Sequence, residues 1–275
     1  MTLAITGSTG ALGSLVAAAL SDLAPTLIVR DPSRAPAIEG SDVRQAAYAD
    51  LDASRTALSG IDTLFMVSAA EAEDRRDQHR TFITAAAEAG VGHIVYTSFA
   101  GAAPDATFTL GRDHWDAESA IRETGMTFTF LRDNFYTDML PLFADAEGLI
   151  RGPAGDGRIA SVGRVDVAEV AAAVLRDPEA HRDATYVLTG PSAITMTEAA
   201  ARAGAVLGRE LRFEDETEEA AYAWRRAEYG AAPWQLDAWV STYTAIRDGS
   251  VAEVTDDVRR VTGHEPRTLE QVLSP

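Results

Sequence analysis

The chain is 275 residues long, 46% of them hydrophobic, and its formal net charge at pH 7 is −18. This length suits one large domain or a domain with a smaller appendage, and the acidic balance repels nucleic acid, so no nucleic-acid partner is expected. Cysteine and lysine are both absent, which excludes disulfides, thiol catalysis, cysteine-ligated metals, Schiff bases and catalytic ammonium groups.

The first half of the chain alternates between strand and helix patterns. Residues 3–6 form a short apolar run, apolar residues then recur at helical spacing from 12 to 20, and residues 26–29 form a second apolar run. The later patterns predict strands at residues 43–46, 63–67, 93–97 and 127–131 and helices at residues 50–58, 74–89 and 112–123. Continuous apolar strands between helices are typical of a parallel sheet covered on both faces. The predicted fold class is therefore α/β, with a Rossmann-type doubly wound parallel sheet and helices on both faces.

The second half of the chain is less regular. Its patterns predict a loop at residues 152–157, helices at 165–175 and 197–207, a strand at 185–189 and an acidic, aromatic helix at 214–229. Gly208 stands just past the second of these helices, where glycine commonly ends a helix. This half is therefore expected to be a smaller α/β region.

Three glycines at the first strand-to-helix turn form the pattern G-x-x-G-x-x-G. Glycines there permit a tight turn, a close approach of the backbone to a pyrophosphate and close packing of helix on strand. The N-terminus of the helix also presents free N–H groups and a partial positive charge. The segment is therefore predicted to bind a dinucleotide through Gly7, Ser8, Thr9, Gly10, Ala11, Leu12 and Gly13.

The end of the second predicted strand bears on which nucleotide binds. NAD-binding domains usually place an acidic residue near that point to hold the ribose 2′-hydroxyl, whereas an arginine accommodates a 2′-phosphate. Arg30 ends the strand, Arg34 is a second candidate, and Asp31 can simply cap a turn. We therefore expect NADP(H) in preference to NAD(H). Asp50 is a candidate acceptor for the adenine, with capping of the next helix as its alternative role.

Small or polar residues follow three of the later strands. Ligands of such sheets bind beyond the carboxyl ends of the strands, so the residues there are candidates for cofactor binding, with plain turns as the alternative. They are Ser68 and Ala69 after the fourth strand, Ser98 and Phe99 after the fifth, and Asn134 and Phe135 after the sixth. The Asn134 amide is a candidate for holding the nicotinamide carboxamide or a substrate carbonyl.

These candidates divide the chain by function as well as by pattern. Residues 1–150 are predicted to form an NAD(P)-binding Rossmann domain, and residues 151–275 a smaller substrate-binding region. No clean linker separates the halves, so the second is expected to pack on the first rather than form an independent domain.

Several segments together resemble the NmrA-like family of atypical short-chain dehydrogenase/reductases. They are TGSTGALG at residues 6–13, VRDP at 29–32, VYTSFAG at 95–101, HWDAE at 114–118, LRDNFY at 131–136 and the tail TGHEPRTL at 262–269. Within the family the chain looks most like the type 2 quinone oxidoreductases and triphenylmethane reductase. That resemblance implies an NADPH-dependent reductase of flat aromatic acceptors. Other members resemble redox sensors that bind the cofactor without turnover.

The absence of lysine removes the usual catalytic relay of short-chain dehydrogenases. That relay pairs a tyrosine with a lysine four residues later. His114 stands where isoflavone-reductase-like relatives have a lysine, and with Ser98 it is the predicted catalytic residue. Glu118, one turn further on, is expected to bias the imidazole. A His–Glu pair on a helix surface is the alternative.

The predicted activity is hydride transfer from NADPH to a quinone or a similar flat conjugated acceptor. The alternatives are a non-catalytic NADP(H) sensor that regulates a protein partner and a biosynthetic ketone or imine reductase. No metal is expected, because no cluster of ligands accompanies His114. No apolar stretch is long enough to span a bilayer and no basic leader opens the chain, so we expect a cytoplasmic protein without a membrane partner. A homodimer is one assembly that the prediction allows.

Overall fold

The computed structural model describes residues 2–274, which fall into two compact units that are each built from separate stretches of chain. Within the described residues, the first unit comprises residues 2–99, 113–132 and 167–186. The second comprises residues 100–112, 133–166 and 187–274. The chain thus leaves the first unit three times and returns to it twice. The expected division at residue 150 stays a prediction.

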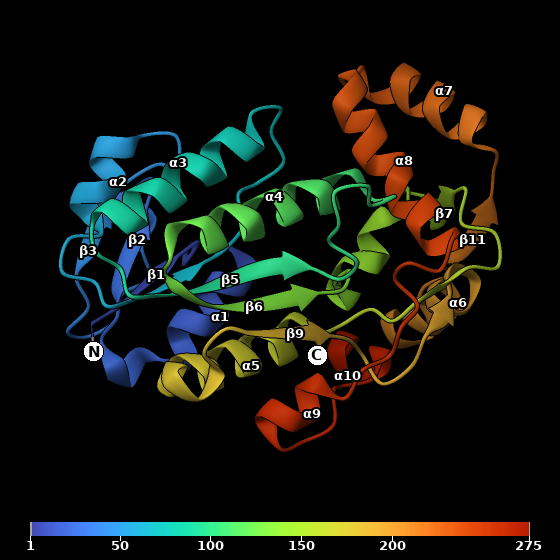
Figure 1. Ribbon diagram of the computed structural model, residues 1–275. Coiled ribbons are helices and arrows are strands. Elements are labelled where there is room, and N and C mark those ends of the chain that lie inside the picture. The colour runs from blue at the N-terminus through green and yellow to red at the C-terminus, as the bar shows by residue number, and fades with distance from the viewer. Residues whose placement is uncertain (1, 275) are drawn as a thin grey trace. The chain divides into compact units, whose positions relative to one another are not determined.

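A seven-stranded sheet forms the centre of the first unit (Figure 1). Its strands follow the order β3-β2-β1-β4-β5-β6-β9, and the four pairs from β3 to β5 are parallel. The strands are β1 (Leu3–Thr6), β2 (Thr26–Val29), β3 (Val43–Gln45), β4 (Thr63–Met66), β5 (His93–Phe99), β6 (Thr127–Asp133) and β9 (Ala184–Leu188). The strand order changes direction between β1 and β4, and ligands of doubly wound sheets bind at such a point.

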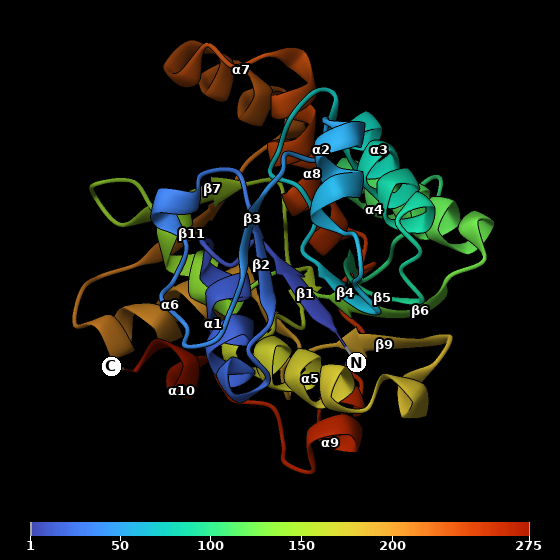
Figure 2. The ribbon, with the colours of Figure 1, turned by 90° about the vertical axis from the view of Figure 1, so that its left-hand side faces the viewer.

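Helices cover both faces of this sheet, as the two ribbon views show (Figures 1 and 2). One face carries α2 (Leu51–Ala57), α3 (Arg75–Glu88) and α4 (Thr109–Thr124), and the other carries α1 (Ala11–Ala19) and α5 (Arg164–Arg176). Short 3₁₀ turns follow at η1 (Ser21–Leu23), η2 (Pro32–Arg34) and η4 (Pro178–His181). The doubly wound α/β fold is therefore confirmed.

The core of the first unit lies between the sheet and its covering helices. All four residues of β1, β2 and β4 are buried, as are all seven of β5. Phe82 on α3 is fully buried, and the Tyr48 ring stacks on it with centroids 4.1 Å apart. Burial of a side chain such as Phe82 stabilises the fold by about 1.5–3 kcal/mol. This core holds the carboxyl ends of the strands in place.

The second unit combines short strands with helices. Parallel strands β7 (Leu149–Gly152) and β11 (Arg212–Asp215) form one pair, and antiparallel β8 (Arg158–Ile159) and β10 (Ile194–Thr195) form another. The remaining elements are η3 (Thr137–Phe143), α6 (Met196–Leu207), α7 (Glu218–Tyr229), α8 (Pro233–Arg247), α9 (Asp257–Thr262) and α10 (Leu269–Leu273). Helix α6 begins at a capping box of Thr195 and Glu198 and ends at Gly208, as expected.

The helix expected at residues 214–229 is partly wrong. Glu214 and Asp215 belong to β11, where they pair with β7. The helix begins only at Glu218, because the Thr217 side chain accepts a hydrogen bond from the backbone N–H of Ala220 and caps the first turn. Helices α7 and α8 then form the hairpin drawn in orange in Figure 1.

No helix within residues 2–274 has both the length and the apolar character needed to cross a membrane.

Candidate functional site

The turn from β1 into α1 is built from backbone packed against backbone. Gly7 has a φ of +65°, which side chains rarely tolerate, and its carbonyl accepts the Gly10 N–H at 2.8 Å. A Cβ on Gly13 would lie 2.2 Å from the Gly7 oxygen, so only glycine fits there. Among residues 2–274, no side chain caps the N-terminus of α1, and the first turn of this helix contains no acidic residue. These N–H groups and the helix dipole can receive an anion.

A second feature of this turn is a buried hydroxyl. Ser8 is 1% exposed, and its Oγ has no hydrogen-bond partner among residues 2–274. Buried polar atoms are usually hydrogen-bonded. The sequence predicts that residues 7–13 hold a pyrophosphate. In the structure, this loop has a buried hydroxyl without a partner and helix N–H groups without a side-chain cap among residues 2–274.

The end of β2 presents two arginines and one aspartate. Arg30 and Arg34 are exposed, and neither guanidinium lies within ion-pair distance of a carboxylate among residues 2–274. The Asp31 carboxylate accepts hydrogen bonds from the Ser33 backbone N–H at 3.0 Å and from the Ser33 hydroxyl at 2.7 Å. These bonds lower the Asp31 pKa. The aspartate therefore caps its own turn, as the sequence allowed.

A tyrosine and a helix-capping aspartate follow the end of β3. The Tyr48 hydroxyl donates to the Val67 carbonyl and lies 2.6 Å from Thr6 Oγ1, which links the ends of β1 and β4. Asp50 is exposed and accepts a hydrogen bond from the Ala53 backbone N–H at 3.0 Å, capping α2. The capping role is thus present, and an adenine contact of Asp50 stays a prediction.

The loop after β4 is held by hydrogen bonds to its backbone. The Ser68 N–H donates to Thr97 Oγ1 at 2.8 Å, and the Ala69 N–H donates to His79 Nε2 at 2.8 Å. Arg75 Nε donates to the Ala69 carbonyl at 2.9 Å. Burial, reinforced by the Arg75 charge, lowers the His79 pKa from 6.5 to about 3, so the ring is neutral. The backbone of Ala69 is therefore fixed at both its N–H and its carbonyl.

His114 is buried in a network that includes the same arginine. Arg75 Nη2 lies 3.1 Å from His114 Nε2, and the Tyr96 hydroxyl lies 3.0 Å from Nδ1. Because a guanidinium only donates, Nε2 accepts and the ring proton resides on Nδ1. Burial and the charge of Arg75 hold the pKa of His114 well below 6.5. Arg75 is also paired with Asp113, at 3.3 Å.

The expected contact between His114 and Glu118 is not formed, and neither residue lies on the surface. Glu118 is fully buried and accepts a 2.6 Å hydrogen bond from the Ser98 hydroxyl. Arg132 binds both carboxylate oxygens of Glu118, at 2.8 and 2.7 Å, and Arg122 adds a third charged contact at 3.1 Å. Strands β5 and β6 supply Ser98 and Arg132, and α4 itself supplies Arg122, so these side chains rather than the imidazole bind the carboxylate. Glu118 therefore joins β5, β6 and α4.

Asn134 and Phe135 adopt the turn role that was their alternative. The Asn134 amide donates to the Val251 carbonyl at 2.9 Å, and its oxygen accepts the Phe135 N–H at 2.8 Å. The Phe135 ring packs edge-on against Phe108, with centroids 5.0 Å apart. Cofactor contacts of Asn134 and Phe135 stay predictions.

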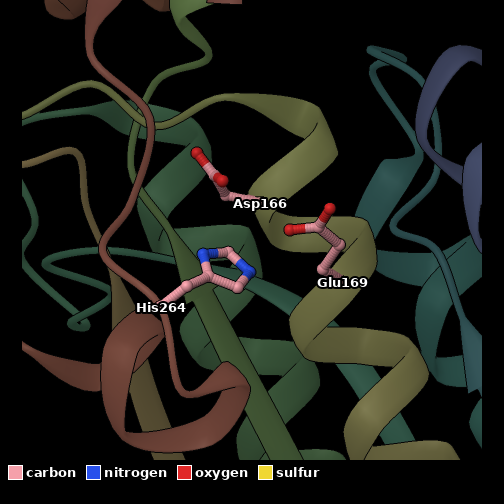
Figure 3. Close-up of side chains that lie close together, drawn as sticks. All are labelled: Asp166, Glu169 and His264. Carbon is pink, nitrogen blue, oxygen red and sulfur yellow. The ribbon is translucent and has the colours of Figure 1, made fainter.

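Figure 3 draws three titratable side chains, Asp166, Glu169 and His264, of which the two acids stand one turn apart on α5. The buried Asp166 carboxylate accepts the Arg267 backbone N–H at 3.0 Å and pairs with the Arg267 guanidinium. His264 Nδ1 lies 3.0 Å from the Glu265 carbonyl. Asp166 therefore serves to fix the C-terminal tail, and the expectation that the chain holds no metal stays a prediction.

Sequence reasoning missed two arginines that bind buried polar groups. Arg75 is 4% exposed although it stands in a charged segment that looks solvated, and the partly exposed Arg132 follows an apolar run and binds the buried Glu118. The spacing of Arg75 and His79 contains a usable signal, because residues four apart share a helix face. Two polar residues on a face that also carries Phe82 point to a buried polar contact.

Comparison with known proteins gives one family and several relatives. A family described as NAD(P)H-binding matches residues 7–178. Quinone oxidoreductase 2 of Escherichia coli strain K12 is 33% identical over 281 residues, which cover 99% of this chain and 97% of that protein. An NAD(P)H azoreductase of Xenophilus azovorans is 34% identical over 275 residues, covering 96% of this chain and 94% of the relative.

Solved structures give the same picture. The crystal structure of the Escherichia coli NADPH-dependent quinone oxidoreductase complexed with NADPH matches with a TM-score of 0.89 and 32% identity, covering 99% of this chain and 98% of that one. The Citrobacter sp. triphenylmethane reductase complexed with NADP(H) matches with a TM-score of 0.84 and 29% identity, covering 99% of each chain.

Proposed function

Because the chain belongs to the NAD(P)H-binding family that matches its residues 7–178, we propose that it is an NADPH-dependent oxidoreductase that passes a hydride to a quinone or a similar flat conjugated acceptor. Its similarity to a quinone oxidoreductase, an azoreductase and a triphenylmethane reductase supports this acceptor class. The observation that carries the proposal is the β1–α1 turn. There Gly13 packs against the backbone of Gly7, and the N-terminus of α1 has no side-chain cap among residues 2–274.

The β1–α1 turn fits a dinucleotide, and the end of β2 supports NADP(H) as the form that binds. Arg30 and Arg34 have guanidinium groups without an ion pair among residues 2–274, and a planar guanidinium suits a 2′-phosphate. Asp31, which could hold a ribose 2′-hydroxyl, is occupied by Ser33. In our proposal these arginines select NADPH over NADH.

Bound NADPH supplies the hydride, and the chain supplies position. With no lysine in the sequence, a Tyr-x-x-x-Lys relay cannot operate. The Ala69 N–H and carbonyl, bound by His79 and Arg75, give the loop after β4 a rigid backbone at the place where the cofactor passes in such folds. Quinones are already electrophilic, so alignment and exclusion of water account for most of the proposed acceleration. In this mechanism the role of His114 is to hold Arg75 and Tyr96 by hydrogen bonds. Direct catalysis by His114 or Ser98 stays a prediction.

The test of the activity follows the loss of reduced-nicotinamide absorbance with a panel of quinones, azo dyes, ketones and imines. Turnover of quinones or azo dyes supports the proposal. Tight NADPH binding with no turnover of any acceptor rejects it in favour of a sensor. Turnover of ketones or imines alone rejects it in favour of a biosynthetic reductase.

The test of cofactor choice compares the dissociation constants of NADPH and NADH for the wild type and for Arg30→Ala. Losing a charge-assisted contact to the 2′-phosphate should weaken NADPH binding by about tenfold or more and leave NADH binding as it was. Arg55→Ala is the matched control, because Arg55 pairs with Asp52 and Glu88 away from the strand end. An unchanged NADPH-to-NADH ratio in Arg30→Ala contradicts the assignment.

A further inference from the structure

The carboxyl ends of β1 and β4 are joined by a side chain that comes from the segment after β3. The Tyr48 hydroxyl donates to the Val67 carbonyl at 2.6 Å, and its oxygen lies 2.6 Å from Thr6 Oγ1. Thr6 is the last residue of β1, and Val67 directly follows β4. The strand order changes direction between these two strands. The bridge therefore spans the point at which ligands of doubly wound sheets bind.

This bridge is a closed ring of hydrogen bonds. The Val67 N–H donates to Thr6 Oγ1 at 2.9 Å, and the Val67 carbonyl can only accept, so the Tyr48 hydrogen points to it. The Thr6 hydrogen goes to the Tyr48 oxygen at 2.6 Å, which is nearer than its other acceptor, the Phe65 carbonyl at 3.3 Å. Both backbone polar groups of Val67 are therefore bound by hydroxyl groups that also bind each other, and such linked hydrogen bonds strengthen one another.

The tyrosine is held in place and remains a donor. Its half-buried ring stacks on Phe82, with centroids 4.1 Å apart. Burial raises the Tyr48 pKa well above 10, and this effect outweighs the hydrogen bond from Thr6 and the charge of Arg30, which both lower the pKa. The hydroxyl therefore stays protonated at neutral pH, and the direction of every hydrogen bond in the ring is kept.

Val67 lies between this hydrogen-bond ring and the β1–α1 turn. A Cβ on Gly7 would lie 2.9 Å from Val67 Cβ and 3.1 Å from Val67 Cγ2, so the valine side chain packs directly on the Gly7 backbone. The Gly7 carbonyl in turn accepts the Gly10 N–H and lies against Gly13. A shift of Val67 would therefore displace the turn that is proposed to hold the pyrophosphate. Tyr48 lies outside this turn but fixes the residue on which it packs.

We propose that Tyr48 is a positioning residue for the dinucleotide, which acts through Val67 to hold the β1–α1 turn in the conformation that binds the pyrophosphate. The inference rests on the proposed function and adds a residue outside the glycine-rich segment to the binding machinery. The pyrophosphate is common to NADPH and NADH, so the role of Tyr48 differs from that of Arg30. Loss of the Tyr48 hydroxyl should weaken both nucleotides by one factor, whereas loss of Arg30 should weaken NADPH alone.

The first experiment follows the hydrogen-bond ring without any nucleotide. Amide hydrogen exchange of Val67 is measured by NMR in the wild type, Tyr48→Phe and Tyr186→Phe. The ring opens in Tyr48→Phe, so we expect the Val67 N–H to exchange at least about tenfold faster there. Tyr186→Phe is the matched control and should exchange as the wild type does, because Tyr186 is buried and its hydroxyl lies 2.7 Å from His181 Nδ1. Equal exchange in Tyr48→Phe and the wild type overturns the proposal.

The second experiment measures the dissociation constants of NADPH and NADH for folded samples of these proteins and of Thr6→Val. The apparent affinity falls with the fraction of molecules whose turn is competent to bind, so Tyr48→Phe should weaken both nucleotides equally, at least about fivefold. Thr6→Val keeps the branched shape and removes the other hydroxyl of the ring, so the same result is expected. Combining the two changes should weaken binding little further, because each change opens the same ring. Tyr186→Phe should bind both nucleotides as the wild type does.

Failure of the proposed function and failure of the inference give different results. If the wild type binds neither nucleotide, the proposed function fails, and the positioning role of Tyr48 fails with it. If the wild type binds NADPH and folded Tyr48→Phe keeps both dissociation constants, the proposed function stands and Tyr48 is only structural. A loss confined to NADPH overturns the inference as well, because Tyr48 would then act on the 2′-phosphate rather than on the turn.

Discussion

The β1–α1 turn and the buried network around Arg75 lie in the same unit but are built in opposite ways. In the turn, backbone packs on backbone, and the decisive feature is the room that Gly13 leaves beside Gly7. In the network, side chains from α3 and α4 and the backbone of the β4 loop meet through hydrogen bonds of Arg75. The first region depends on the lack of a side chain at Gly13, and the second depends on the long side chain of Arg75.

This contrast teaches how each region tolerates change. A backbone contact has no adjustable part, so any added atom must displace the chain. A network of hydrogen bonds can lose one member and keep the fold, but the partners left behind are then buried and unpaired. Substitutions at Gly13 should therefore fail through overlap, and those at Arg75 through unsatisfied groups.

The largest effect is expected for Gly13→Ala. Its Cβ would meet the Gly7 oxygen at 2.2 Å and the Gly7 carbonyl carbon at 2.4 Å. We expect a loss of about 4 kcal/mol in the free energy of unfolding, together with loss of NADPH binding, measured by urea unfolding and cofactor fluorescence. The matched control is Gly92→Ala, where a Cβ meets only the Asp62 oxygen at an ordinary 3.5 Å. Equal losses in the two variants contradict the backbone-contact account.

A smaller effect is expected for Arg75→Met, which tests the other half of the comparison. The change leaves His114 Nε2 and the Ala69 carbonyl without their donor, and a loss of about 3 kcal/mol in the free energy of unfolding should follow. Arg76→Met is the control, because Arg76 binds the same Asp113 from the surface at 2.6 Å. Exposed pairs contribute about 0–1 kcal/mol. A comparable loss in both variants would mean that the network adds nothing beyond surface charge.

The smallest effect concerns the pH dependence of stability. The folded-state pKa of His79 is about 3, below its ordinary value, so between pH 6.5 and 3 the unfolded chain binds a proton that the folded chain does not. The free energy of unfolding should therefore fall as pH drops through this window, by up to about 1.4 kcal/mol per pH unit for this residue. Urea unfolding at pH 7 and pH 5 should show a shallower fall in His79→Gln than in the wild type. Parallel falls contradict a buried neutral ring.

The β1–α1 turn was predictable because its requirements are local. Three glycines at fixed spacing after an apolar run specify a turn, a close contact and a helix start within seven residues. The capping box at Thr195 and Glu198 is equally local, and α6 was predicted within one residue of its bounds. In both places the residues that decide the structure are neighbours in the sequence.

The buried charges were not predictable because their partners are distant. Helical spacing predicted a His114–Glu118 pair, but Ser98 from β5 and Arg132 from β6 take the Glu118 carboxylate. Strands β7, β8 and β10 were missed for a related reason. They are two to four residues long, too short for an alternating pattern to register, and they form only where a partner strand is present.

The repeated passage of the chain between the two units has a consequence for biosynthesis. Most of strand β9 and most of helix α5 belong to the first unit, but the chain reaches these parts only at residues 167–186. A nascent polypeptide that has emerged only as far as residue 150 still lacks the seventh strand of the sheet and one of the helices that cover it. The unit that contains the predicted nucleotide-binding turn therefore cannot complete its sheet until residues 167–186 have been synthesised. A fragment that ends at residue 150 should expose an unpaired sheet edge and aggregate.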